Sequence, residues 1–257
     1  MALVCALLPL YLIVTTSFKL GRDAFAMPPK WIFSPTTEHY AKVFSESRFV
    51  DTYWNSLVIS FGSVGVAILV GLPAAYALTR YQFRGKGLMT QLFLGSRIFP
   101  QIAILIPLFV AWTYLGLRDT LVGLTLAYVQ LNLAMVIWML RGFLLDFPIE
   151  LEEAAWVDGA SRLGAFWRVI LPLVVPGVAA TCILGVIFSW NEFLFALALS
   201  ARHARPVTVT VYNFLHFEEV QWGQLHAAGT LVMLPVLIFA LLVQRYIVRG
   251  LVSGALK

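Results

Sequence analysis

Charged residues are scarce in this chain of 257 residues. They make up 12% of it, about half their usual share in soluble domains, while 60% of the residues are hydrophobic. The formal charge of +5 does not indicate a nucleic-acid partner, because no basic stripe with interleaved aromatic residues occurs. The lysines and arginines instead stand at the ends of apolar runs, where they would meet water and membrane lipids. The composition therefore excludes an ordinary soluble domain and indicates a membrane protein.

Cysteine is rare as well, with two residues in the whole chain. Cys5 and Cys182 both lie inside apolar runs, which favours small buried side chains over a disulfide or a metal pair. Three histidines in or beside one polar segment have no spacing typical of a metal site: His203, His216 and His226. We therefore expect no metal and no cofactor to be bound by this chain.

Long apolar runs, in contrast, recur along the sequence. Each is near 20 residues and can cross the roughly 30 Å hydrocarbon layer as a helix. The runs are continuous rather than alternating, which favours helices over the strands of a barrel. The sequence thus predicts an all-α membrane protein, a single domain over 1–257, with six transmembrane helices. The predicted spans are about 1–18, 55–79, 88–112, 121–141, 170–198 and 228–249.

The polar segments between these spans predict an orientation. With six spans, the segments at about 19–54 and 199–227 lie on one side of the membrane. The segment at about 147–169 lies on the other side, together with a basic group near residues 80–86. Because cytosolic segments carry an excess of lysine and arginine, we expect this second side to be cytosolic.

The cytosolic segment at about 147–169 reads as helix, turn, helix. Three glutamates favour the positive N-terminal end of its first helix, and Gly159 is placed to end that helix in a left-handed cap. Ser161 is placed to cap the next helix. Ala154, Ala155 and Ala160 offer a small, close-packing face. Such a rigid segment suits either docking into a groove of another protein or an ordinary amphipathic loop at the interface.

Four strings carry a resemblance. The first is Glu153-Ala154-Ala155-x-x-Asp158-Gly159-Ala160, followed by Leu171-Pro172-Leu173 and Pro176, with Val169 where isoleucine is usual. It resembles the "EAA" loop of ABC-importer permeases. The others are Ser189-Trp190-Asn191-Glu192-Phe193, Trp222-Gly223-x-x-x-Ala227-Ala228, and the C-terminal run from Gln244 to Ala255. With the first, they are similar to the maltose-type carbohydrate permeases, MalG-like subfamily, over nearly the whole chain.

The resemblance implies a type I ABC importer permease fold with a cytosolic coupling helix in a prokaryotic inner membrane. It also implies four partners: a second homologous permease, two ATP-binding subunits that use ATP and Mg, and an extracytoplasmic solute-binding protein. Glu153 is then expected to pair with a basic residue of the ATPase, and Gly159 to set the bend. The tail, 250–257, is expected to contact the ATPases. No phosphate-binding Gly-x-x-x-x-Gly-Lys-[Ser/Thr] loop occurs, so this chain is not expected to be an enzyme.

Polar residues inside the spans are candidates for the solute pathway. Counted by helical rise, Gln101, Gln130 and Asn132 lie near the midplane, and their amides suit either sugar hydroxyls or hydrogen bonds between helices. Arg97 lies nearer the cytosol than Glu192, so no direct pair is expected between them. Residues near the outer surface form a candidate outer gate or binding-protein contact: Asn191, Glu192 and Trp222. The alternative for Glu192 is an interfacial carboxylate capped by Asn191.

The sequence therefore predicts the permease subunit of an ATP-driven importer for sugars or related polyhydroxy solutes. The alternative is an ion-coupled secondary transporter, which would favour midplane carboxylates and often an internal repeat, neither of which is evident. A structural membrane subunit without transport would not need prolines in several spans together with midplane amides.

Overall fold

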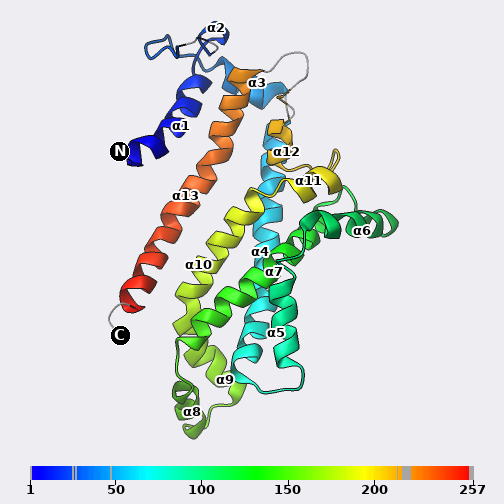
Figure 1. Cartoon of the computed structure of the whole chain (residues 1–257), viewed down its shortest axis with the longest axis vertical. Coiled ribbons are helices and arrows are strands. Elements are labelled where there is room, and N and C mark those ends of the chain that lie inside the picture. Colours follow the sequence, from blue (N-terminus) through cyan, green and yellow to red (C-terminus); the bar gives the residue numbers. More distant parts are fainter. Residues whose placement is uncertain are drawn as a thin grey trace.

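The computed structural model describes residues 2–24, 26, 28–46, 48–212, 214–215 and 221–254. The regular elements in this part of the chain are helices, as the composition predicted (Figure 1). In order they are α1 (Ala2–Ser17), α2 (Gly21–Ala24), α3 (Glu38–Glu46), α4 (Phe49–Arg80), α5 (Lys86–Gly95), α6 (Gln101–Tyr114), α7 (Leu121–Leu145), α8 (Glu150–Val157), α9 (Arg162–Ala165), the π-helix η1 (Phe166–Ile170), α10 (Leu171–Trp190), α11 (Leu194–Leu199), α12 (Val207–Tyr212) and α13 (Trp222–Gly254).

Four helical stretches in the described residues are long and apolar enough to cross a membrane. They are Phe49–Arg80, Leu121–Leu145, Arg162–Trp190 and Trp222–Gln244. Shorter apolar helices occupy the other two predicted spans, at Leu7–Ser17 and Gln101–Tyr114.

The third predicted span, 88–112, is wrong as a single helix. The structure breaks it after Gly95 into α5 and α6. Pro100 stands immediately before α6 with an extended ψ of 125°. Proline lacks an N–H to continue the ladder and disfavours helical geometry in the residue before it, so the chain changes direction here.

The fifth predicted span, 170–198, is also interrupted. α10 ends at Trp190, and α11 begins only at Leu194. The Glu192 carboxylate lies between them and accepts a hydrogen bond from the Phe195 N–H at 2.6 Å. The side chain thus satisfies a backbone donor in the first turn of α11, which stabilises a helix start there rather than continuation of α10.

The core lies where α4 packs along α7 and α10 packs against both. Ala67, Val136, Leu140 and Ile170 are 0% exposed there. Gly71 allows the close approach of α4 and α7, because a Cβ on it would lie 2.7 Å from the Val136 side chain. α1 packs against α13, which also contacts α10 and α3.

The cysteines differ in burial. Cys182 on α10 is half-buried, but Cys5 on α1 is exposed. The prediction that both are buried is therefore wrong for Cys5.

The molecule is long, and its two ends differ in structure. α8 and α9 lie at one end, and α2 and α3 lie at the other (Figure 1). We call these the α8 end and the α3 end. The segment 147–169 forms the α8 end, whereas the described parts of the segments 19–54 and 199–227 gather toward the α3 end.

Candidate functional site

The α8 end carries a sharply turned elbow between α8 and α9. Gly159 has a φ of +87°, the left-handed conformation that favours glycine. The Ala160 N–H donates to the Ala155 carbonyl at 2.9 Å and so closes the end of α8. The Ser161 hydroxyl accepts from the Gly164 N–H at 3.1 Å and begins α9. The helix–turn–helix and both caps predicted from the sequence are confirmed.

The residues of the predicted docking motif lie mostly on the surface of this elbow. Glu153, Ala154, Asp158 and Gly159 are exposed, whereas Ala155 and Ala160 are half-buried: the motif exposes two carboxylates and two small residues.

Glu152, next to the motif, faces the other way. Its side chain is 1% exposed. One carboxylate oxygen accepts from Arg80 Nε at 2.5 Å and the other from the Tyr76 hydroxyl at 2.5 Å. Arg80 also donates to the Phe147 carbonyl at 2.9 Å. These bonds attach α8 to the end of α4. Burial of an ion pair is opposed by the loss of hydration of both charges. Removing one partner from a buried pair is nevertheless strongly destabilising, because it leaves the other charge buried and unpaired.

The buried contacts of Glu152 were not predicted from the sequence, because the adjacent glutamates of this helix were treated alike. Neighbouring residues on a helix lie about 100° apart, so Glu152 and Glu153 cannot share one direction. The available signal was the occurrence of two adjacent glutamates on a helix that packs beside an apolar bundle, since one of the two must then point toward the bundle.

A second contact holds the elbow. The Arg162 guanidinium lies 5.4 Å from the Trp156 ring centroid and 5.7 Å from that of Tyr81. Arg162 thereby joins α9 to α8 and to the end of α4, by cation–π attraction.

A small cavity of about 70 Å³ lies between α6, α7 and α10. Its lining combines charged, amide, hydroxyl and apolar side chains: Arg97, Gln101, Tyr128, Leu131, Asn132, Met135, Phe188, Ser189 and Glu192. Donors and acceptors of this variety suit a solute with several hydroxyl groups.

Two of the three predicted midplane amides line this cavity. Gln101 and Asn132 are lining residues, but Gln130 is exposed and is not among them. Gln130 and Asn132 are two residues apart on α7, so their side chains point about 200° apart. Asn132 is 4% exposed and donates to Ser189 Oγ at 2.7 Å, so it also bonds between helices.

Arg97 and Glu192 line the same cavity, although the depth count placed Arg97 nearer the cytosol. The depth count assumed one continuous helix over 88–112, and the break before α6 removes that assumption. The described contacts do not pair them directly. Arg97 lies 5.9 Å from the Phe188 ring centroid, and Glu192 accepts from the Phe195 N–H.

The other two candidate gate residues lie apart from these contacts. Asn191 is exposed and donates to the Ile187 carbonyl at 2.8 Å, so it does not cap Glu192 as the alternative supposed. Trp222 opens α13 and is 39% exposed, and it is not among the cavity-lining residues.

Comparison with known proteins gives the family. Residues 67–253 match the family described as "Binding-protein-dependent transport system inner membrane component". The chain is 38% identical to a probable ABC transporter permease of Sinorhizobium fredii, over 98% of this chain and 90% of that protein. It is 37% identical to the trehalose transport system permease SugB of Mycobacterium tuberculosis, over 98% and 93%. It is 36% identical to the trehalose/maltose permease MalG of Thermococcus litoralis, over 100% and 93%.

Among solved structures, the fold is similar to a chain of a bacterial ABC transporter involved in alginate import. The TM-score is 0.77 with 23% sequence identity, over 95% of this chain and 91% of that one. With the four apolar spans, the match over most of the sequence and several relatives above one-third identity, the chain belongs to the family of binding-protein-dependent transport system inner membrane components.

Proposed function

We propose that this chain is the permease subunit of an ATP-driven, binding-protein-dependent importer for sugars or related polyhydroxy solutes. The observation that carries the proposal is the elbow at the α8 end, which is exposed on one face and attached to α4 by the buried Glu152 on the other. Relatives named for trehalose, maltose and diacetylchitobiose support the solute class. None of the comparisons supports the ion-coupled alternative.

The proposed topology has six spans, with the third formed by α5 and α6 and the fifth by α10. The α8 end then faces the cytosol, and the segments at about 19–54 and 199–227 are extracytoplasmic. The basic residues of the α8 end support this orientation: Arg80, Arg84 and Lys86.

The proposed coupling begins at the outer face of the elbow. The motif seats in one of two ATP-binding subunits, which bind ATP and Mg. Its residues are Glu153, Ala154, Ala155, Asp158, Gly159 and Ala160. Movement of α8 then passes through Glu152 to Arg80 on α4. Because α4 packs along α7 and α10, the movement reaches the walls of the cavity between α6, α7 and α10, which we call the central cavity. The tail at 250–257 is proposed as a further ATPase contact, although the side chains from residue 245 onward lie outside the described residues.

The proposed solute pathway runs through the central cavity, with Gln101 and Asn132 as hydrogen-bonding groups. The cavity encloses about 70 Å³, whereas ligand pockets measure roughly 300–1,000 Å³. A second, homologous permease would therefore supply the remaining wall, and an extracytoplasmic binding protein would deliver the solute. Two solved structures of similar fold support partners of this kind: an alginate transporter "in complex with alginate pentasaccharide-bound periplasmic protein" and a "MetNI methionine ABC transporter".

Transport assays on the whole complex test the proposal. The permease pair, the ATP-binding subunits and the binding protein are reconstituted in liposomes, and uptake of radiolabelled trehalose, maltose and glycerol is followed. Uptake of at least one solute should require ATP and should persist when ionophores collapse the ion gradients. Uptake that needs an ion gradient and continues without ATP would contradict the proposal.

A further inference from the structure

A basic pocket lies at the α3 end, between the start of α4 and the segment after α11. It encloses about 190 Å³. Its lining residues are mostly polar and include Arg48, Asp51, Asn55, Arg202, His203 and Arg205. The lining contains three arginines and one carboxylate, so its charge is about +2 when the histidine is counted as neutral.

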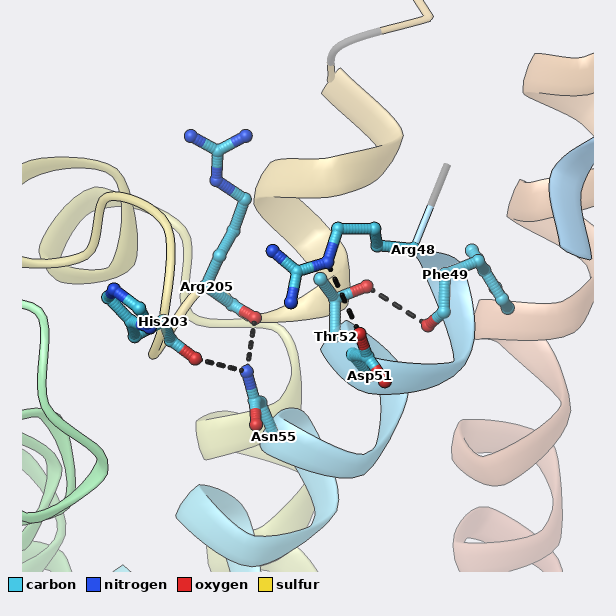
Figure 2. Close-up of polar contacts among 7 residues, drawn as sticks. All are labelled: Arg48, Phe49, Asp51, Thr52, Asn55, His203 and Arg205. Atoms are coloured by element: carbon cyan, nitrogen blue, oxygen red, sulfur yellow. Dashed lines mark hydrogen bonds and ion pairs between the residues drawn. The ribbon is translucent and has the colours of Figure 1, made fainter. Parts of the chain in front are cut away.

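The wall opposite α4 is held in place by hydrogen bonds from α4 itself. The Asn55 amide donates to the carbonyls of His203 and Arg205, at 2.9 and 3.1 Å (Figure 2). The Ser56 hydroxyl accepts from the Val207 N–H at 2.8 Å. The arginine-bearing segment is therefore a fixed surface rather than a loose loop, which reduces the entropy lost when a partner binds.

Asp119, in the turn between α6 and α7, fixes the same segment from the other side. Its carboxylate accepts from four consecutive backbone N–H groups, from Ala201 to Ala204, at 2.7 to 3.1 Å. Burial raises the pKa of this carboxyl, but the four N–H donors outweigh it and lower the pKa to about 2. The negative charge of Asp119 is thus engaged by the backbone, and Asp119 is not among the residues that line the pocket.

Two guanidinium groups in the pocket have N–H donors that could bind a further acceptor. Arg48 has a left-handed φ of 50° and reaches Asp51 through Nε at 3.3 Å, with 60% of its side chain exposed. Arg205 Nε is buried and has no hydrogen-bond partner in the described part of the chain. Figure 2 shows the Arg205 guanidinium pointing away from the carbonyl that Asn55 binds. A buried donor without a partner is unfavourable, and a bound carboxylate would relieve that cost.

The position of the pocket favours a water-soluble partner. α4 has 32 residues and is therefore about 48 Å long, against a hydrocarbon layer of roughly 30 Å. If its basic end at Arg80 lies at the cytosolic surface, its first turns project beyond the lipid tails on the other side. The pocket is built on these first turns.

Hydrogen bonds also link the pocket to the cavity between α6, α7 and α10. The Glu192 carbonyl accepts from the Tyr128 hydroxyl at 3.2 Å and from the Thr208 hydroxyl at 3.3 Å. Thr208 follows the pocket segment directly, and Tyr128 and Glu192 line the cavity. A partner seated in the pocket would therefore bear on the residues around the solute pathway.

We propose that this pocket is a docking point for an acidic side chain of the extracytoplasmic solute-binding protein. The inference rests on the proposed function and its orientation, and it adds the surface and the chemistry of the contact. Arginine is the side chain best suited to a carboxylate, which it binds through two parallel N–H groups. The excess positive charge would also steer an acidic surface toward the pocket at low salt.

The test measures docking on the intact transporter in nanodiscs of neutral lipid. The probe is the purified solute-binding protein that supports uptake in the reconstituted transporter, and its Kd is measured at low and high salt. Arg202→Glu should raise Kd about tenfold or more and weaken its salt dependence. Arg205→Met, which keeps the apolar stem, should raise Kd without lowering the melting temperature. Arg118→Glu is the matched control: it makes the same charge change on the turn beside Asp119, outside the pocket, and should leave Kd unchanged.

A charge exchange gives the sharpest support: an acidic residue of the binding protein changed to arginine should restore docking to Arg202→Glu. Equal Kd values for the wild type and all three variants would overturn the inference while the proposed function stands. A wild-type complex that fails to bind the probe would instead overturn the proposed function. Should the variants differ from the wild type only in nanodiscs of anionic lipid, the pocket would be a lipid head-group site, and the docking inference would be wrong.

Discussion

Each end of the molecule contains an arginine–carboxylate pair, and the two pairs differ in burial. At the α8 end, the side chains of Arg80 and Glu152 are 10% and 1% exposed. At the α3 end, those of Arg48 and Asp51 are 60% and 62% exposed. The buried pair joins two elements of the same chain, whereas the exposed pair keeps its groups available to a partner. The same chemistry thus fixes structure at one end and offers recognition at the other.

The largest expected effect is loss of transport when the outer face of the elbow is changed. Gly159→Pro forces a negative φ where +87° is found, and Glu153→Lys reverses the charge of the exposed face. Both variants should insert normally but lose ATP-coupled uptake, measured in liposomes. Glu150→Lys is the matched control, on the same helix but outside the motif, and should retain most uptake. Normal uptake by both motif variants would remove the coupling assignment.

The next largest effect tests the inner side of the same helix. Glu152→Leu leaves Arg80 buried without its partner and should destabilise the complex by about 3–5 kcal/mol. Asp51→Leu makes a comparable change in the exposed pair and should cost about 1 kcal/mol or less. Thermal unfolding of the purified complex measures both. Equal losses in the two variants would contradict the contrast between the ends.

A smaller effect is expected in the central cavity. Gln101→Leu removes a lining amide and should raise the KM for solute about three- to tenfold, as expected for one lost hydrogen bond. Gln130→Leu is the control, because Gln130 lies outside the cavity, and it should leave KM unchanged. A change confined to Gln130→Leu would mean that the pathway runs elsewhere.

The smallest effect is a pH dependence of stability at the α3 end. The pKa of Asp119 is lowered to about 2, against about 3.9 in an unfolded chain. Its contribution to stability is therefore complete above the unfolded pKa and is lost as pH falls from about 4 to about 2. Asp119→Asn should flatten this part of the curve of melting temperature against pH. An unchanged slope in the variant would assign the acid sensitivity to other carboxyls.

The sequence predicted the helical class, the helix–turn–helix of the elbow and both of its caps. These features depend on local causes: continuous apolar runs, a glycine at φ +87° and a serine before a helix start. Pro100 and Glu192 are evident in the sequence. Whether they interrupt a helix depends on whether neighbouring groups supply hydrogen bonds to the backbone groups that the break leaves unpaired. The continuous third and fifth spans were wrong for that reason.

The sequence by itself determined that the chain crosses a membrane and bears an exposed acidic elbow, because hydropathy and turn chemistry act over a few residues. Only the tertiary structure decided which of two adjacent glutamates turns inward, which amide reaches the cavity, and that Arg97 and Glu192 share its lining. It also brought together Arg48 and Arg205, which are far apart in the sequence. The physical reason is that burial, and with it the effect of a charge, is set by the packing of distant helices.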